Sequence, residues 1–180
     1  DRTGEGETVG VVAVIWITGL LLRAALFTLE PVLSDDFYRY LWDGHVQRSG
    51  INPYLHAPAA SGVEGLRTTW HGLINNPTVP TIYPPFAQIA FLPAAMAGSA
   101  LWILKATWLL CDLLTAVFVT RIAKATGRRP ALALLLYLWA PLLVIEVAWS
   151  AHLEPLGMAA MMGSVLALSR PGVRDRLREA

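Results

Sequence analysis

Residues 9–29 read VGVVAVIWITGLLLRAALFTL, and this stretch decides the fold class. Arg23 is its one charged residue. A helix rises 1.5 Å per residue, so about 20 apolar residues are needed to cross the hydrocarbon core of a bilayer. The stretch lacks the short apolar core and small-residue cleavage site of a signal peptide. We therefore expect a membrane-spanning helix here.

Three further apolar stretches follow, at residues 101–123, 131–149 and 155–169. Pro141 interrupts the second of these three stretches, and the last is short and rich in Met, Ala and Gly. The whole chain is 55% hydrophobic and only 15% charged, whereas soluble domains have about 25% charged residues. These features predict an all-α, polytopic helical membrane protein with about four spans.

Composition also excludes several classes of protein. The net charge of +1 gives no electrostatic footprint for nucleic acid. The single Cys111 cannot form an internal disulfide. Because residue 1 is Asp and residue 180 falls in a charged stretch, we expect the chain to be a piece of a longer membrane protein.

A polar stretch, residues 30–82, separates the first two apolar spans. Loops of this length are usually functional or disordered. Its many aromatic residues favour order and suit a partly helical element at the membrane surface. Residues 83–98 are apolar but short and contain Pro93, so we expect an interfacial or re-entrant segment rather than a crossing.

Basic residues indicate the orientation of the spans. Eight of the 14 lie in two short segments, at Arg121, Lys124, Arg128 and Arg129 and at Arg170, Arg174, Arg176 and Arg178. The positive-inside rule places both segments in the cytoplasm. If residues 83–98 do not cross, the long loop 30–82 is extracytoplasmic, and residues 149–154 lie on the same face.

The densest group of chemically active side chains follows the first span, in Leu33-Ser-Asp-Asp-Phe-Tyr-Arg-Tyr-Leu-Trp-Asp-Gly-His45. Ser34 is a plausible N-cap for a helix that starts at Asp35. Asp36, Tyr40 and Asp43 would share one face of this helix, and Arg39 could pair with either carboxylate. Paired acids at a membrane cavity can act as a general base or bind a divalent cation. The alternative is a capped surface helix whose acids only cap and pair.

Other motifs allow both a structural and a binding role. Gly50-Ile-Asn-Pro-Tyr54 predicts a turn anchored by Tyr54. Near Pro84 and Pro85, a lipid headgroup could meet Tyr83 and Gln88. At the end of the third span, His152 and Glu154 could bind a phosphate or orient a hydroxyl, or His152 could simply be solvated.

Ionisable residues inside apolar spans are functional candidates by default. We expect Arg23 to extend its charge toward the interface, and Lys105 to reach a lipid phosphate. For Asp112 we expect pairing within the helix bundle.

Taken in order, these motifs resemble those of the polytopic glycosyltransferases of the C superfamily, in particular the branch of mannosyltransferase-like proteins that use polyprenyl-phosphate sugars. The matching residues are 34–44, 50–54, 82–85 with Gln88, and 139–142 through 152–154. The second motif of that group usually reads Gly-His-x-Asp, whereas this chain has Ala151 before His152 and Glu154 in place of Asp.

The resemblance implies that residues 1–180 are the N-terminal part of one membrane-embedded glycosyltransferase domain. It implies transfer of a sugar, which in this branch is mannose, from a polyprenyl-phosphate donor to an acceptor hydroxyl with inversion. The transfer would occur at the extracytoplasmic face of the plasma membrane, and the acceptor would be a glycan or glycolipid.

The resemblance also assigns roles to residues. Asp36, or its neighbour Asp35, would be the catalytic base, and His152 and Glu154 would contact substrate. Tyr38 and Tyr40 are candidates to stack on sugars. The charge of the leaving phosphate would be stabilised by Arg39, Lys105, or a bound Mg²⁺ or Mn²⁺.

Two other functions remain open at this point. A transporter or flippase for lipid-linked sugars could use Lys105 and Asp112 as a polar track, but its typical internal repeats are not seen. A noncatalytic assembly subunit would tolerate substitution of Asp36. The acid-rich loop favours the enzyme.

Overall fold

The computed structural model describes residues 2–169, and the described residues are helical with no strand. They form two units, each described by itself below. The first, which we call the apolar unit, contains residues 2–29, 108–149 and 153–169. The second, the loop unit, contains residues 30–107 and 150–152. The all-α prediction is therefore confirmed.

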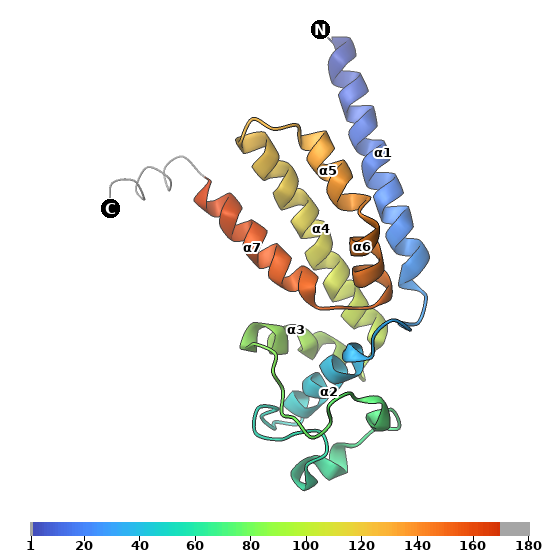
Figure 1. Ribbon diagram of the computed structural model, residues 1–180, viewed down its shortest axis with the longest axis vertical. Helices are drawn as coiled ribbons and strands as arrows, with labels where there is room; N and C mark the ends of the chain where they lie inside the picture. The colour runs from blue at the N-terminus through green and yellow to red at the C-terminus, as the bar shows by residue number, and fades with distance from the viewer. Residues whose placement is uncertain (1, 170–180) are drawn as a thin grey trace, which may run out of the picture. The chain divides into compact units, whose positions relative to one another are not determined.

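Two helices are long and apolar enough to cross a membrane. The first lies within α1 (Arg2–Phe27), over Val9–Phe27, and the second is α4 (Leu101–Ala125) (Figure 1). Both were expected at these places. Residues from Trp108 onward in α4 belong to the apolar unit, and its first two turns belong to the loop unit.

The third expected span is broken rather than continuous. It consists of α5 (Pro130–Leu138), α6 (Pro141–Val144) and the wider helical turn η3 (Ile145–Trp149), with a bend of 54° between Pro130–Leu138 and Pro141–Trp149. Proline has no N–H to donate and clashes with the preceding turn. Pro141 therefore starts a new helix after a break at Trp139 and Ala140.

The fourth expected span is the helix α7 (Glu154–Leu168), whose 15 residues extend about 22 Å. This is shorter than the hydrocarbon core of about 30 Å. By length and composition, residues 2–169 therefore hold two candidate spans, or three if the bent pair counts as one, where about four were expected.

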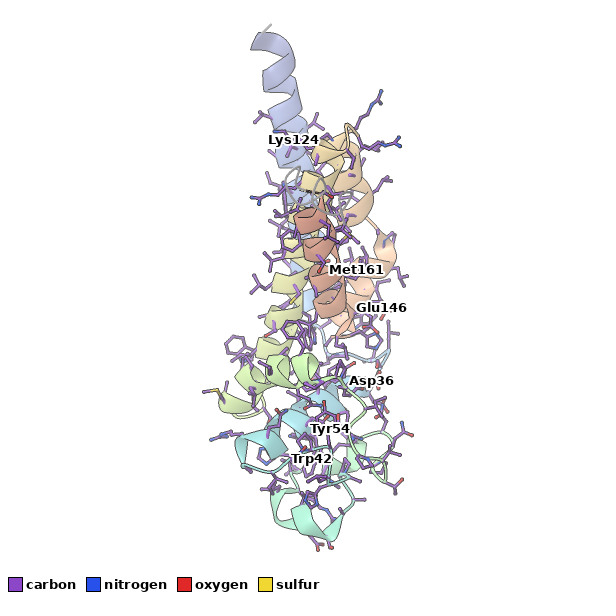
Figure 2. The ribbon with its side chains drawn as sticks, turned by 90° about the vertical axis from the view of Figure 1, so that its left-hand side faces the viewer. Asp36, Trp42, Tyr54, Lys124, Glu146 and Met161 are labelled. Carbon is purple, nitrogen blue, oxygen red and sulfur yellow. The ribbon has the colours of Figure 1, made fainter. Side chains whose placement is uncertain are left out.

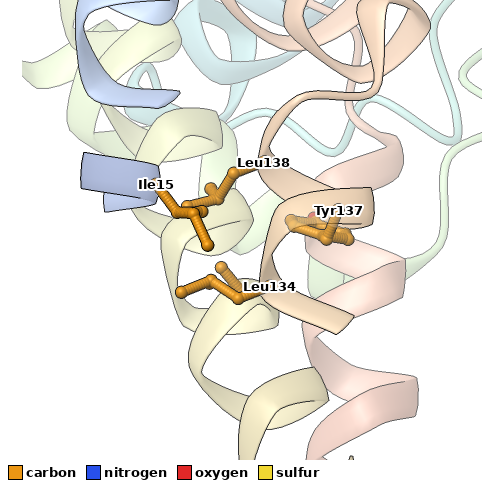
Figure 3. Packing of buried hydrophobic residues seen from close by; sticks show 5 residues of the cluster. Ile15, Leu134, Tyr137 and Leu138 are labelled. Atoms are coloured by element: carbon orange, nitrogen blue, oxygen red, sulfur yellow. The ribbon is translucent and has the colours of Figure 1, made fainter. Parts of the chain in front are cut away.

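An apolar cluster holds α1, α4 and α5 together in the apolar unit. Its buried members are Ile15, Ala116, Leu134, Tyr137 and Leu138 (Figure 3). α1 and α5 approach closely at Gly19, where an added Cβ would lie 2.9 Å from the Cβ of Leu138.

A buried ion pair adds a polar link to this core. Arg23 donates from Nε to Asp112 Oδ2 at 2.6 Å, and both side chains are fully buried. Arg23 also donates to the Leu138 carbonyl at 2.8 Å, and the Tyr137 hydroxyl donates to Asp112 Oδ1 at 2.9 Å. Pairing of Asp112 within the bundle is confirmed. The expectation that Arg23 extends toward the interface was wrong, because Asp112 neutralises its charge inside the bundle.

The loop unit is built on two packed helices, α2 (Asp36–Arg48) and α3 (Pro85–Met96). They meet at Gly44, where an added Cβ would lie 2.8 Å from the carbonyl oxygen of Phe91. The expected partly helical loop is thus confirmed. Two short 3₁₀ turns, η1 (Ser61–Leu66) and η2 (His71–Leu73), complete it.

A second apolar cluster packs the turns η1 and η2 against α2. Its buried members are Trp42, Val46, Val63 and Ile74. The expected turn is also present: Gly50 has φ +78°, and the Tyr54 hydroxyl donates to the Tyr83 carbonyl at 2.5 Å. Tyr54 therefore anchors the turn to the segment that leads into α3. Figure 2 labels Asp36, Trp42 and Tyr54 in this unit.

Candidate functional site

Asp35 and Asp36 stand at the start of α2 and share one hydrogen-bond donor. The Nδ2 amide of Asn75 donates to Asp35 Oδ1 at 2.9 Å and to Asp36 Oδ1 at 2.5 Å. An amide that satisfies two carboxylates at once fixes the orientation of both. Asn75 is 39 residues from Asp36 along the chain, and no spacing in the sequence indicated it.

The helix begins one residue later than expected. Asp35 is the N-cap residue, and its carbonyl accepts from the Tyr38 N–H at 3.1 Å. Its carboxylate makes no cap bond, because it faces Asn75 instead. The Ser34 hydroxyl oxygen accepts from the Asp36 N–H at 3.2 Å and so supports the turn without being the cap.

The second oxygen of Asp36 faces His152. The distance from Asp36 Oδ2 to His152 Nε2 is 3.9 Å, within the range of an ion pair when the imidazole is protonated. The Asp36 side chain is 39% exposed and that of His152 is 24% exposed. The loop unit therefore brings together the two motifs that the sequence placed on one membrane face.

The backbone just before His152 has an unusual conformation. Ala151 is buried and has φ 59°, in the left-handed region that favours glycine. The related pattern has Gly at this position, and the geometry explains why: the chain must turn sharply to carry His152 toward Asp36.

Arg39 joins α2 to the loop that carries Asn75. It donates from Nε to Asp43 Oδ1 at 3.0 Å and from its terminal nitrogens to the carbonyls of Val79 and Asn76, at 2.8 and 3.4 Å. Of the two acids that it was expected to reach, Arg39 pairs with Asp43. Because its partners are the loop backbone and Asp43, Arg39 holds residues 76–79 against α2.

Asp43 is the centre of a buried polar network. The Gln88 amide donates to Asp43 Oδ2 at 3.0 Å and to the Thr81 hydroxyl at 2.8 Å, and Gln47 donates to Gln88 Oε1 at 2.6 Å. Burial raises the pKa of Asp43, and this outweighs the opposing effects of Thr81, Gln88 and Arg39. Asp43 and Gln88 are almost fully buried, so their hydrogen bonds serve the fold of the loop unit.

Comparison with known proteins identifies the family. A family model described as alpha-(1->6)-mannopyranosyltransferase, N-terminal domain, matches residues 3–175. The chain belongs to this mannosyltransferase family. A search of curated proteins found no match, and a search of solved structures found none either.

Because the chain belongs to this mannosyltransferase family, it is part of a membrane-associated glycosyltransferase. Such an enzyme acts on a sugar donor and an acceptor. The resemblance stated from the motifs is thus confirmed at the level of the family. The roles of individual residues stay predictions, and the structure tells where each of them lies.

The aromatic candidates of this mannosyltransferase domain pack on one another. Tyr40 stacks on Phe91 with ring centres 5.1 Å apart, and Tyr83 meets both rings edge-on. Tyr38 stacks on Trp70 at 6.1 Å. Burial, with a contribution from the charge of Asp36, raises the pKa of Tyr83 to about 12. Tyr83 is therefore a neutral phenol at physiological pH and cannot act as a base.

Two further candidates, Lys105 and Glu154, belong to other helices than the carboxylates. Lys105 is buried in the first turns of α4, within the loop unit. Glu154 belongs to the apolar unit, where its exposed side chain stands in the first turn of α7. Their contacts with substrate stay predictions.

The fit of a divalent metal can be judged from the ligands. Mg²⁺ and Mn²⁺ prefer several oxygen ligands in near-octahedral arrangement. Among residues 2–169, no group of three or more His, Cys, Asp and Glu side chains converges. Asp35 and Asp36 also share their Oδ1 atoms with Asn75. One or two carboxylates can still hold such an ion when waters and substrate phosphates supply the other ligands, so a bound Mg²⁺ or Mn²⁺ stays a prediction.

The arrangement around Asp36 suits one kind of chemistry, the acceptance of a proton. It presents a partly exposed carboxylate whose two oxygens have fixed neighbours, Asn75 on one side and His152 on the other. Such a carboxylate can accept a proton from a hydroxyl that approaches its open side.

Proposed function

We propose that this domain serves the transfer of mannose from a polyprenyl-phosphate donor to an acceptor hydroxyl, with inversion at the anomeric carbon and with Asp36 as general base. The observation that carries the proposal is the partly exposed Asp36 carboxylate held between Asn75 and His152. The family supports mannosyl transfer in general. The donor, the acceptor and the stereochemistry belong to the proposal.

The proposed step is a single displacement. The acceptor hydroxyl gives its proton to the Asp36 carboxylate while its oxygen forms a bond to the anomeric carbon. The bond from that carbon to the lipid-phosphate oxygen breaks, and the electron pair leaves with the phosphate. General-base help of this kind typically contributes about 10²–10⁴-fold.

Asp36 suits this role better than its neighbours. Asp43 is almost fully buried and paired with Arg39. Asp35 is exposed but has no positively charged partner among its hydrogen bonds, whereas Asp36 faces His152. His152 thus gives the second oxygen of Asp36 a fixed neighbour, which Asp35 lacks.

The leaving phosphate needs positive charge nearby. Arg39 was a candidate, but its hydrogen bonds go to Asp43 and to the loop backbone. We propose Lys105 and His152 for this contact, and Glu154 for contact with the sugar or acceptor.

The proposed reaction is placed at the extracytoplasmic face of the plasma membrane. The clusters of basic residues support this side for the loop 30–82 by the positive-inside rule. A donor with a polyprenyl chain stays in the bilayer, so an enzyme that uses it needs its site at the membrane surface.

The test of the donor and of inversion uses the full-length protein in membranes. A β-configured polyprenyl-phosphate mannose, ¹³C-labelled at the anomeric carbon, is supplied with membrane glycolipid as acceptor. The proposal predicts a product whose one-bond carbon–proton coupling is that of an α-linkage. A β-linked product would contradict inversion. Transfer from a nucleotide-activated mannose, with none from the lipid donor, would contradict the donor class.

A further inference from the structure

A shallow groove of about 510 Å³ lies within the loop unit, between the end of α2, the turn at residues 50–54 and the first half of α3. Its volume falls in the range of about 300–1,000 Å³ that is typical of small-molecule sites. It is lined by Gln47, residues 50–54, Pro85, Gln88, Ile89 and Leu92. The groove is separate from the carboxylates at the start of α2.

The wall of the groove is uncharged. All the residues that line it are described by the structure, and none of them is Asp, Glu, Lys, Arg or His. A phosphate or carboxylate bound here would lose water without gaining a counter-charge, which is costly. The groove therefore suits a neutral ligand better than the phosphate of a lipid-linked donor.

Two side-chain amides give the groove open hydrogen-bonding groups. Asn52 Oδ1 accepts from the Tyr54 N–H at 2.9 Å, while Asn52 Nδ2 donates to no described residue. Gln47 Nε2 donates to Gln88 Oε1 at 2.6 Å, while Gln47 Oε1 accepts from no described residue. A hydrocarbon chain would cover these groups without satisfying them, which costs free energy. A ligand that carries hydroxyl groups can satisfy both.

Tyr54 adds a fixed aromatic ring to the wall (Figure 2). Its hydroxyl donates to the Tyr83 carbonyl at 2.5 Å, and the residue is still 39% exposed. A ring that is already held in place loses little conformational entropy when a ligand stacks on it. A pyranose ring has apolar C–H faces and a hydroxyl-bearing edge, so an aromatic ring beside side-chain amides matches both of its surfaces.

The groove lies at the opposite end of α2 from Asp36. Gln47 follows Asp36 by 11 residues, which corresponds to about 16 Å along the helix axis. A single sugar whose hydroxyl reacts at Asp36 is too small to reach the groove. A chain of several sugars can span this distance.

We propose that the groove binds the neutral glycan part of the acceptor, several sugars away from the hydroxyl that reacts. Tyr54 stacks on one sugar ring, while Asn52 donates to its hydroxyl groups and Gln47 accepts from them. The inference rests on the proposed function in one respect, since it takes the bound glycan to be the acceptor of the transfer.

Binding of an oligosaccharide to the full-length protein in lipid nanodiscs, without any donor, tests this inference. The probe is α-(1→6)-linked mannotetraose, which has the linkage named in the family description. Saturation-transfer NMR detects weak binding and gives Kd for the wild type, Tyr54→Leu and Tyr54→Phe. Both variants lose the hydroxyl contact with Tyr83, and only Tyr54→Leu loses the ring. Leu55→Ala is the matched control, because Leu55 is exposed and does not line the groove.

Tyr54→Leu is expected to raise the Kd of the tetrasaccharide about tenfold, whereas Tyr54→Phe and Leu55→Ala should change it little. Asn52→Asp keeps the oxygen that accepts from the Tyr54 N–H but loses the amide donor, so it should also weaken binding. An unchanged Kd in Tyr54→Leu would overturn the inference, because the tetrasaccharide would then bind elsewhere. Absence of binding to the wild type would overturn it as well. Circular dichroism checks that each variant retains its helices.

The outcome of this experiment is independent of mannosyl transfer. Because no donor is present, a failure of transfer from polyprenyl-phosphate mannose would leave these dissociation constants unchanged. Conversely, if Asp36→Asn abolishes transfer while Tyr54→Leu binds the tetrasaccharide like the wild type, the groove loses its assignment and the proposed function stands.

Discussion

Asn75 and Asp36 are the closest partners in the candidate site: the Asn75 amide donates to Asp36 Oδ1 at 2.5 Å and reaches Asp35 with the same nitrogen. This places Asn75 as a positioning residue for both carboxylates. The hydrogen bond from Asn75 limits rotation of the Asp36 carboxylate. A carboxylate that rotates freely would present its oxygen less often in the reactive orientation.

Replacing Asn75 by Ala is expected to lower kcat for mannosyl transfer about tenfold or more, because Asp36 loses its orienting donor. KM for the lipid donor is expected to change little, because Asn75 is assigned no contact with the donor. Steady-state kinetics in membranes measure both constants. Asn76→Gly, at the neighbouring position with φ 46°, serves as the control and is expected to keep kcat. An equal loss in both variants would mean that the loop as a whole, and not the Asn75 amide, matters.

Removal of Asp43 is expected to destabilise the loop unit strongly. Asp43→Ala leaves Arg39 buried without its counter-charge, which typically costs about 3–5 kcal/mol. Glu64→Ala breaks the exposed pair with Arg67 and is expected to cost at most about 1 kcal/mol. The midpoints of thermal unfolding in detergent compare the two. Similar shifts of the unfolding midpoint in both variants would show that the buried pair contributes no more to stability than an exposed pair.

The raised pKa of Asp43 predicts the direction of a pH effect. A folded-state pKa above the unfolded value of 3.8 means that the folded protein binds the proton more readily. The stability that Asp43 gains from binding this proton is fully present below pH 3.8, and it is lost as pH rises through the folded-state pKa. The stability of the wild type relative to Asp43→Asn should therefore rise as pH is lowered from 7 toward 4. Unfolding midpoints of both proteins across this range check the sign, and a relative fall of the wild type would refute it.

Gly44→Ala is expected to separate α2 from α3. The new Cβ would lie 2.8 Å from the Phe91 carbonyl oxygen, a backbone atom that cannot move aside alone. Overpacking of this kind costs about 1–3 kcal/mol. Gly65→Ala is the matched control, because nothing lies within 4 Å of its added Cβ. Limited proteolysis of the loop unit should increase for the first variant and not for the second; equal resistance would contradict the close approach.

The sequence predicted those parts of the fold that depend on local composition. The apolar runs predicted the two candidate spans, and the acidic motif at 34–44 predicted the start of α2 within one residue. Pro141 was noted inside the third run, but a continuous span was still expected; the missing proline N–H and the clash with the preceding turn broke it. The fourth run is short in the sequence, and the helix α7 that it forms ends at Leu168.

The remaining features depend on contacts between distant residues, which no local pattern specifies. Arg23 was expected to reach the interface, yet its partner Asp112 is 89 residues away. Arg39 had two possible partners on its own helix, and the choice of Asp43 followed from the loop carbonyls of Asn76 and Val79. Asn75 stands in a polar turn like many others, so only the folded loop reveals its role.

The most direct test of the central claim compares Asp36→Asn with Asp35→Asn. Both variants keep the shape of the side chain, and both keep an oxygen that can accept from Asn75. Transfer from labelled polyprenyl-phosphate mannose is measured in membranes of full-length protein at matched expression. We expect transfer to fall about 10²–10⁴-fold for Asp36→Asn and much less for Asp35→Asn. Transfer that survives in Asp36→Asn would contradict the claim that Asp36 is the base.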